Sequence, residues 1–171
     1  MDVEVTTYYL EMRTPDELNP KTTIPDGLEI RKIGVPSPEF SRFLYVTVGR
    51  DWLWIDRLDW PAKKWKRWVD RDELDTWVAY MKGAPAGYFE LVVQKDKSVE
   101  LAFFGLLPQF IGKGLGGYLL SEAIRKAWDR DASRVWVHTC TLDHRHALGN
   151  YEARGLAIVR EETHIQDIAD A

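Results

Sequence analysis

The residues with the clearest chemical potential are four glycines within six positions, Gly112, Gly114, Gly116 and Gly117, in the stretch 101–120. An apolar run precedes these glycines and a helical pattern follows them, which predicts a turn between a buried strand and a helix. Glycines let successive backbone N–H groups face one point, and a helix N-terminus carries partial positive charge. The stretch therefore predicts a cradle for an anion, and we infer a pyrophosphate group as its ligand.

Three phosphate-binding patterns compete for these glycines. A Walker A loop needs Ser or Thr after Gly-Lys to hold magnesium, whereas Gly114 follows Lys113, so this pattern is excluded. The dinucleotide pattern GxGxxG is present, but residues 108–111 separate it from the strand, and it does not open a βαβ half. A turn that binds nothing explains the glycines poorly, because each glycine lowers helix stability by about 1 kcal/mol where the helix has begun.

The third pattern accounts best for the order of strand, Leu-Pro, short linker and Gly-Lys-Gly-Leu-Gly. This order resembles the acetyl-CoA loop of the GNAT superfamily of N-acetyltransferases, which reads Arg/Gln-x-x-Gly-x-Gly/Ala. In the preferred register the loop falls on 111–116, and Ile111 stands where the family has Arg or Gln. A register that begins at Gln109 satisfies the pattern literally and stays open.

The resemblance implies how acetyl-CoA, the expected cosubstrate, would be held. The pantetheine arm would run along main-chain groups of Leu106 and Leu107, one of whose N–H groups could polarise the thioester carbonyl. The diphosphate would meet the backbone amides of Ile111, Gly112, Lys113, Gly114, Leu115, Gly116 and Gly117.

Acetyl transfer to an amine requires a base, because an alkyl amine with a pKa of about 10 is mostly protonated at neutral pH. Glu100 lies eleven residues before Ile111, the spacing of the glutamate base in histone-acetylating members of the family. On a regular strand Glu100 would share a face with Ala102, Phe104 and Leu106, and burial there would raise its pKa. An exposed strand-end glutamate is an equal alternative, and Glu90 is the second candidate base.

Tyr151 is the expected acid. Residues 147–156 have the spacing Ala-x-x-x-Tyr-x-x-x-Gly-Leu, which resembles the family's fourth motif with Leu156 in place of Phe. The resemblance implies that the Tyr151 hydroxyl protonates the departing thiolate, while a tyrosine that only packs remains the alternative. His144 and Arg145 replace the asparagine and proline that often open this helix in the family.

The acceptor is expected to be a primary amine on a small molecule or peptide. The family builds acceptor sites from its first helices, which implies a pocket lined by Tyr45, Trp52 and Trp54, although core packing explains these residues equally well. His138 is a further candidate for substrate binding. The cluster of His138, Cys140, Asp143, His144 and His146 matches no zinc spacing, and direct transfer needs no cysteine nucleophile, so no metal is expected.

The bulk composition limits the class of protein. A chain of 171 residues with 45% hydrophobic content predicts one domain with a real core. The net charge of −4 argues against a nucleic-acid partner. Basic residues in the range 63–67 interleave with tryptophans, and acidic residues in the range 70–75 offset their positive charge. We therefore interpret the basic residues as the solvated face of an amphipathic helix. One cysteine, no signal sequence and no long apolar run indicate a cytoplasmic protein without membrane contact, either a monomer or a homodimer.

The predicted elements alternate in the order of the GNAT fold, an α/β (α+β) architecture with a mixed, mostly antiparallel central sheet flanked by helices. Residues 1–27 are expected to form an N-terminal strand and loop extension of one domain, 1–171. The resemblance covers about residues 28–162. The alternative function is a non-catalytic sensor that binds acetyl-CoA.

Strands are predicted at 3–13, 28–33, 76–81, 88–93, 99–107, 134–139 and 156–160. Helices are predicted at 37–49, at 60–70 with Asp59 as the cap, from the glycine loop to 128, and at 144–155.

Overall fold

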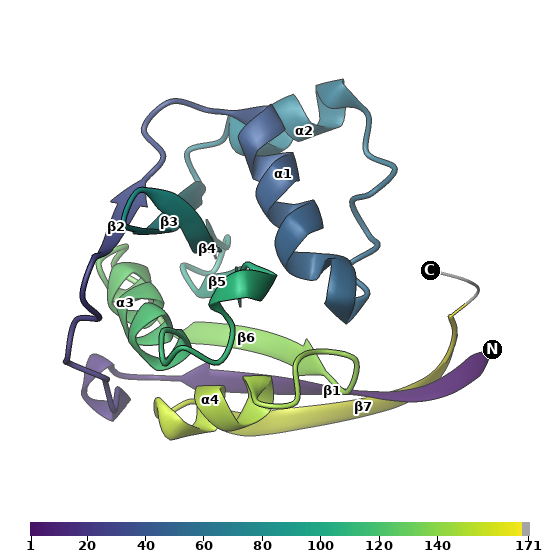
Figure 1. Cartoon of the computed structure of the whole chain (residues 1–171). Helices are drawn as coiled ribbons and strands as arrows, with labels where there is room; N and C mark the ends of the chain where they lie inside the picture. The colour runs from purple at the N-terminus through teal and green to yellow at the C-terminus, as the bar shows by residue number, and fades with distance from the viewer. Residues whose placement is uncertain (169–171) are drawn as a thin grey trace.

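The computed structural model describes residues 1–168, in which seven strands form one sheet of order β2-β3-β4-β5-β6-β1-β7 (Figure 1). The β5–β6 pair is parallel and the other neighbouring pairs are antiparallel. This confirms a mixed, mostly antiparallel α/β architecture. The strands are β1 (Asp2–Met12), β2 (Leu28–Lys32), β3 (Leu74–Met81), β4 (Ala84–Val93), β5 (Val99–Leu106), β6 (Val135–Cys140) and β7 (Ala157–Asp167). The α-helices are α1 (Pro38–Gly49), α2 (Ala62–Val69), α3 (Gly116–Trp128) and α4 (Ala147–Ala153).

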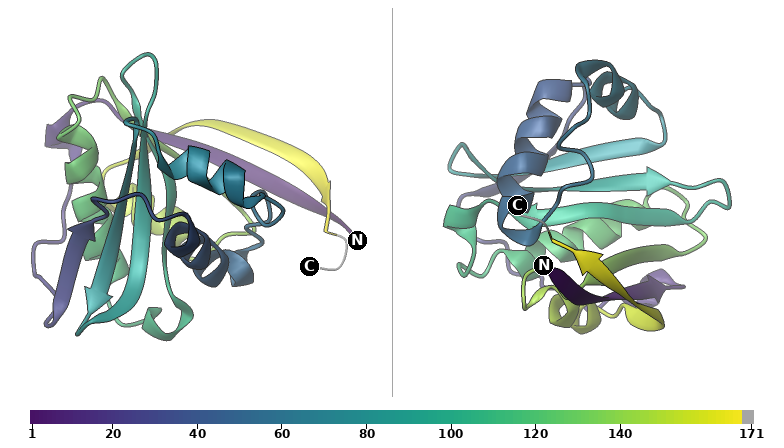
Figure 2. Two further views of the ribbon diagram at one scale, coloured as in Figure 1. Left: turned by 90° about the horizontal axis from the view of Figure 1, so that it is seen from above. Right: turned by 90° about the vertical axis from the view of Figure 1, so that its right-hand side faces the viewer.

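Helices cover both faces of the sheet, as the two views of Figure 2 show. On one face α3 buries the apolar side of its helical repeat, including Leu120 and Ile124, against β4, β5 and β6. On the other face α1 places Leu44 and Val48 against Tyr88 of β4. The second helix on this face, α2, buries Trp65 and leaves its lysines exposed, as the amphipathic pattern predicts.

The N-terminal strand lies inside the sheet. β1 pairs with β6 on one side, where Tyr9 faces His138, and with β7 on the other, where Thr6 faces Thr163. Residues 2–12 are therefore an interior strand rather than a peripheral extension. β7 continues to Asp167, beyond the predicted end at 160, because β1 supplies partners for its whole length. The paired ends of β1 and β7 extend past the body of the protein (Figures 1 and 2).

Other predicted boundaries also differ from the structure. The hairpin between β3 and β4 turns at Lys82 and Gly83, both with positive φ (49° and 89°), so residues 84–87 belong to the strand. Helix α2 begins after Pro61, which is its N-cap, and Asp59 does not cap it. Helix α4 begins at Ala147 rather than at residue 144.

A β-bulge changes which side chains of β5 face each helix layer. Glu90 pairs with Phe103 but Leu91 pairs with Leu101, so Ala102 is an extra residue in β5. Because the alternation of faces is interrupted there, Phe104 packs in the α3 core with Leu101, while Phe103 packs with the α1 residues. The prediction that Glu100 shares a face with Phe104 and Leu106 is therefore wrong.

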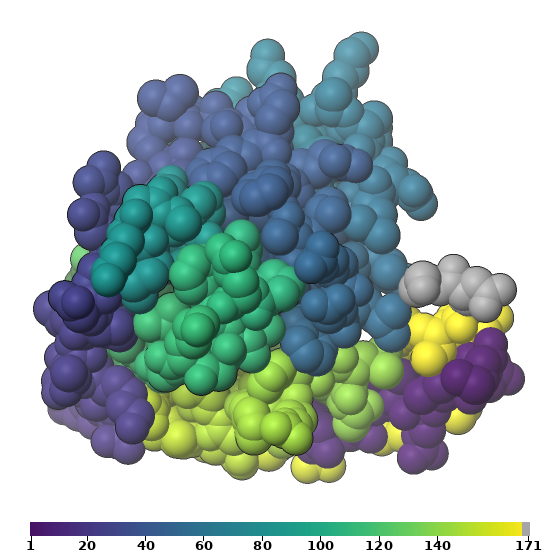
Figure 3. Space-filling model, in the orientation of Figure 1, coloured from purple at the N-terminus to yellow at the C-terminus, as the bar shows by residue number. Residues whose placement is uncertain are grey.

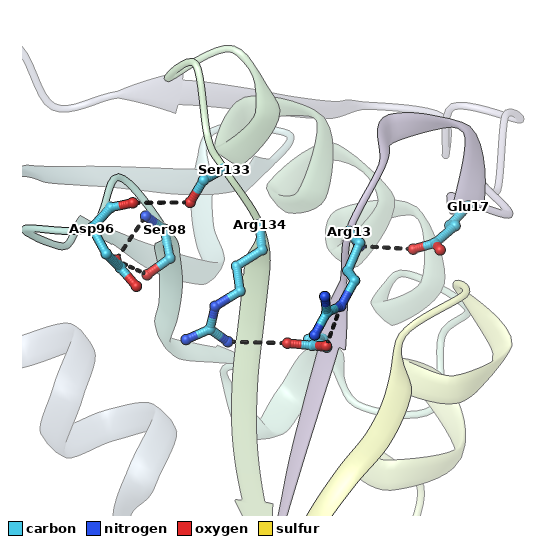
Figure 4. A network of polar contacts seen from close by, with 7 residues as sticks. Arg13, Glu17, Asp96, Ser98, Ser133 and Arg134 are labelled. Atoms are coloured by element: carbon cyan, nitrogen blue, oxygen red, sulfur yellow. Dashed lines mark hydrogen bonds and ion pairs between the residues drawn. The ribbon is translucent and has the colours of Figure 1, made fainter.

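Polar contacts cluster where β5 and β6 begin (Figure 4). Asp96 accepts hydrogen bonds from the Ser98 backbone N–H (2.9 Å) and hydroxyl (2.6 Å), which lower the pKa of its carboxyl group. The Ser133 hydroxyl donates to the Asp96 carbonyl (3.1 Å), and Arg134 pairs with Glu11 of β1 (3.2 Å). Of these contacts, the Ser133–Asp96 hydrogen bond joins the segments that precede β5 and β6, and the Arg134–Glu11 pair joins β6 to β1.

We expect Gly155→Ala to lower the free energy of unfolding by about 2 kcal/mol or more. Gly155 has a φ of +105°, and a Cβ there would lie 2.0 Å from the Glu17 carbonyl oxygen. The matched control is Gly149→Ala within α4, where a Cβ meets nothing within 4 Å. This control should be neutral or add up to about 1 kcal/mol. Urea denaturation measures both, and equal effects would contradict the role given to Gly155.

Candidate active site

The site lies where β5 and β6 separate. These parallel strands pair only at Val99 with Val135 and at Glu100 with Trp136, and they diverge beyond those pairs. A cavity of about 850 Å³ occupies the opening and extends to the glycine loop, to α4 and to residues 52–57. In the space-filling view the segment around the glycine loop lies at the surface between α1 and α4 (Figure 3).

The glycine loop has the geometry of an anion cradle. Gly112 and Gly114 have φ values of 77° and 78°, and a Cβ at either would meet nothing within 4 Å, so the backbone conformation and not space requires glycine there. The loop leads directly into Gly116, the first residue of the 13-residue helix α3. The cavity reaches Ile111 and the loop glycines, whereas Lys113 is exposed and outside its wall. The loop glycines and the first residues of α3 thus border one open space.

Of the two residues expected to contact the pantetheine arm through the main chain, Leu106 and Leu107, only one borders the cavity. Leu106 borders the cavity. Leu107 does not, and its N–H already donates to the Ala86 carbonyl at 2.8 Å. Its carbonyl accepts the Phe110 N–H at 2.9 Å, so both of its backbone groups are engaged within the protein.

Tyr151 of α4 lies on the cavity wall with only 6% of its surface exposed. Its ring packs edge-on against Phe104, with ring centroids 6.2 Å apart. Burial, followed by the nearby charge of Asp143, raises the pKa of the phenol far above its ordinary value. The hydroxyl is protonated at neutral pH, as that of an ordinary tyrosine is, and the raised pKa makes it a weaker acid than an exposed phenol.

Glu100 borders the same cavity from β5. Gln94 donates a hydrogen bond to one carboxylate oxygen at 3.1 Å, and the Nε2 atom of His138 lies 3.8 Å from the other. Burial raises the pKa of Glu100, although His138 and Arg57 act in the opposite direction. A half-buried carboxylate with a raised pKa suits proton abstraction from an amine.

Glu90 does not share this position, because its carboxylate is fully buried and does not line the cavity. Arg57 Nη1 contacts both of its oxygens (3.1 and 3.0 Å), and Trp68 Nε1 donates to one of them at 3.2 Å. Burial raises the pKa of Glu90, and the Arg57 guanidinium opposes this rise. The geometry therefore places Glu90 in a structural ion pair without access to a substrate.

Aromatic rings enclose the guanidinium of this pair. The Arg57 Cζ atom lies 4.1 Å from the Trp68 ring centroid and 4.2 Å from that of Phe103. Tyr45, expected to line an acceptor pocket, borders the cavity but is fully buried beside Arg57, and its hydroxyl accepts the Arg57 backbone N–H at 3.2 Å. Much of the tryptophan-rich segment thus surrounds a cation of the protein itself. Sequence reasoning missed Arg57, whose one signal is a basic residue inside the run 52–60.

Trp52 and Trp54 both border the cavity and connect its two sides. Trp54 Nε1 donates to Asp143 Oδ1 at 3.4 Å, and the Trp52 ring lies edge-on to His144 at 4.9 Å. Because Asp143 and His144 follow β6, these contacts join the segment after α1 to the loop before α4. The sequence suggests Asp143 only as a possible metal ligand, whereas in the fold it accepts hydrogen bonds from Trp54, Thr139 and Cys140.

The histidine and cysteine cluster lies on this cavity as well. His138 is half-exposed beside Glu100, and burial raises the pKa of the Cys140 thiol, which does not favour a thiolate nucleophile. Burial, with His146 and Arg145, lowers the pKa of His144. Asp143 accepts hydrogen bonds from the Thr139 hydroxyl and the Cys140 N–H. Within residues 1–168 no three such side chains come together as a metal site.

Comparison with known proteins identifies the family. The profile of the acetyltransferase (GNAT) family matches residues 41–156, and the chain belongs to this family. No protein of curated function matches the sequence. Among residues 1–168 there is no helix both long and apolar enough to cross a membrane.

Solved structures share the fold at low sequence identity. A GCN5-related N-acetyltransferase from Kribbella flavida is 18% identical with a TM-score of 0.70, over 98% of this chain and 60% of that one. One from Sphaerobacter thermophilus is 17% identical with a TM-score of 0.69, over 94% of this chain and 50% of the other. The chain thus spans about half to three fifths of their length. An aminoglycoside acetyltransferase from an uncultured soil metagenomic sample is 12% identical with a TM-score of 0.61, over 77% and 90% respectively.

The Arg57–Glu90 pair yields a stability prediction. Arg57→Met or Glu90→Leu alone should each lower the free energy of unfolding by about 3 kcal/mol, because each leaves a buried charge without its partner. The double variant should lose less than either single variant, since it buries no charge. Chemical denaturation of the three variants and the parent protein forms the cycle. A double variant that loses the sum of the two single effects would contradict the pairing.

Proposed function

We propose that this chain is an acetyl-CoA-dependent N-acetyltransferase that acts on a primary amine of a small molecule or peptide, by direct attack in a ternary complex. The observation that carries the proposal is one cavity bordered by the glycine loop, by Glu100 and by Tyr151. The family relationship supports acetyl transfer in general. The proposal extends to one acetyltransferase domain, a monomer or homodimer, in the cytoplasm.

Acetyl-CoA would supply the acetyl group as a thioester. Backbone amides of residues 111–117 would hold its diphosphate, and the strand end at Leu106 would orient the pantetheine arm. The reaction releases one proton from the attacking amine and requires one at the sulfur. The chain offers a group for each of these transfers on the same cavity.

Glu100 is the proposed base, directly or through a water molecule. Its carboxylate accepts a proton from the amine nitrogen, and its raised pKa makes it a stronger base than an ordinary carboxylate. Tyr151 is the proposed acid, whose protonated hydroxyl gives its proton to the departing sulfur. Trp52, Trp54 and His138 would contact the acceptor, since all three border the cavity and His138 lies beside Glu100.

The acceptor is an amine by analogy as well as by site chemistry. One of the solved structures with this fold is an aminoglycoside acetyltransferase, whose named substrates carry amines. In this chain the aromatic rings around Arg57 are already occupied, so the acceptor would use the part of the cavity nearer Trp52 and His144.

A direct assay tests the proposal against a sensor that binds the coenzyme without turnover. Isothermal titration measures binding of acetyl-CoA, and a panel of primary amines is then screened for release of free thiol. Binding together with amine-dependent thiol release supports the enzyme. Binding without thiol release across the panel favours the sensor, and absence of binding overturns both functions.

Tyr151→Phe should lower kcat by about 10²-fold or more, because it removes the hydroxyl that donates a proton to the departing thiolate. The affinity for acetyl-CoA should change less than about twofold, since the ring still packs against Phe104. Steady-state kinetics and isothermal titration separate the two effects. Unchanged kcat would remove Tyr151 from the role of acid.

Glu100→Gln should lower kcat/KM by about 10²-fold and flatten the acidic limb of the pH–rate profile. The sign follows from the chemistry, because the base acts when ionised and its activity is lost as pH falls through its pKa. Since burial raises this pKa, the limb should lie above the ordinary carboxyl range. Glu100→Asp is the control that should retain a limb at reduced rate. A limb that survives in Glu100→Gln would assign the base elsewhere.

A further inference from the structure

Two cations from distant parts of the chain meet at the first turn of α3. A Cβ added at Gly117 would lie 2.9 Å from Lys21 Cγ and 3.0 Å from Arg154 Nη1. Gly117 has no unusual φ, so a larger residue here would have to displace the Lys21 or Arg154 side chain, both of which approach the helix backbone closely. They lie where a side chain of α3 would otherwise be.

Arg154 is the unusual member of this pair. Only 7% of its surface is exposed, and its Nε and Nη1 atoms have no hydrogen-bond partner among residues 1–168. None of the ion pairs among these residues includes Arg154 or Lys21. A buried cation without a counter-ion is costly, and the positive end of α3 beside it adds to the cost. An anion bound at this point would relieve both.

The chain holds these groups firmly in place. The Lys21 N–H donates to the Ser121 hydroxyl (2.9 Å), which in turn donates to the Gly117 carbonyl (2.7 Å). The Asn19 N–H donates to the Arg154 carbonyl at 2.9 Å. The segment before β2 is therefore tied to α3 and to the end of α4, and it presents the exposed Lys21 side chain over the helix terminus.

We propose that Lys21 and Arg154 form a subsite for a phosphomonoester, which would bind the 3′-phosphate of coenzyme A. The inference depends on the proposed coenzyme. Neither residue borders the cavity that reaches the loop amides, so the pair lies beyond the diphosphate cradle, separated from it by the Gly117 backbone. Lys21 contacts the phosphate, and Arg154, whose two unpaired nitrogens are buried, is a positioning residue that supplies fixed charge behind it.

Titration with coenzyme A and with 3′-dephospho-coenzyme A tests the subsite. The parent protein should bind coenzyme A at least about tenfold more tightly, because a charged hydrogen bond is lost with the phosphate. Lys21→Ala should remove most of this preference while its affinity for the dephospho form stays within about twofold. Lys95→Ala, which removes an exposed lysine from the β4–β5 turn, is the control and should keep the full preference.

Arg154→Met separates fixed charge from a structural role. If the buried charge is unpaired, the ligand-free variant should melt at the same or a higher temperature, while the shift caused by coenzyme A becomes smaller. A lower melting temperature with an unchanged shift would make Arg154 a packing residue and would overturn its part in the subsite.

The outcomes distinguish this inference from the proposed function. If neither ligand binds the parent protein, the coenzyme proposal fails. If the parent protein binds both ligands equally, or Lys21→Ala weakens both equally, the coenzyme proposal stands and the phosphomonoester subsite is overturned.

Discussion

β5 and β6 remain paired over only two residues each, and the site depends on this early separation. The Ser133–Asp96 hydrogen bond and the backbone bond from the Val99 N–H to the Arg134 carbonyl join the two strands at their start, and the opening begins beyond these contacts. The bulge at Ala102 then turns the following side chains of β5, which leaves Glu100 on the cavity and Phe104 in the core beneath Tyr151. Without the separation, Glu100, Tyr151 and the glycine loop would not border one space.

In the wall opposite α4 the buried charges are paired with each other. Arg57 and Glu90 neutralise each other, and the surrounding rings exclude water from the pair. Buried ion pairs contribute little net stability but strongly disfavour arrangements that separate them. The segment after α1 is thereby fixed, and Trp54 and Trp52 can reach Asp143 and His144 across the cavity. The aromatic zone is thus chiefly architecture, of which one edge faces the acceptor side.

Positively charged groups surround the glycine loop and the start of α3. Positive φ at Gly112 and Gly114 shapes the cradle, whereas Gly117 serves close packing by Lys21 and Arg154. Partial charge from the α3 terminus and full charge from these two side chains act in the same direction. These positively charged groups lie together at the start of α3 in a chain whose net charge is −4.

The sequence alone determined the order of strands and helices, the glycine loop and the family, because these depend on local periodicity, turn chemistry and short motifs. Glu100 and Tyr151 could be chosen as candidate catalytic residues for the same reason. The tertiary structure alone decided that β1 lies between β6 and β7, that Ala102 forms a bulge, and that Glu90 is paired with Arg57. Strand pairing and buried ion pairs join residues far apart in the chain, and no local pattern encodes which partner a strand or a charge will meet.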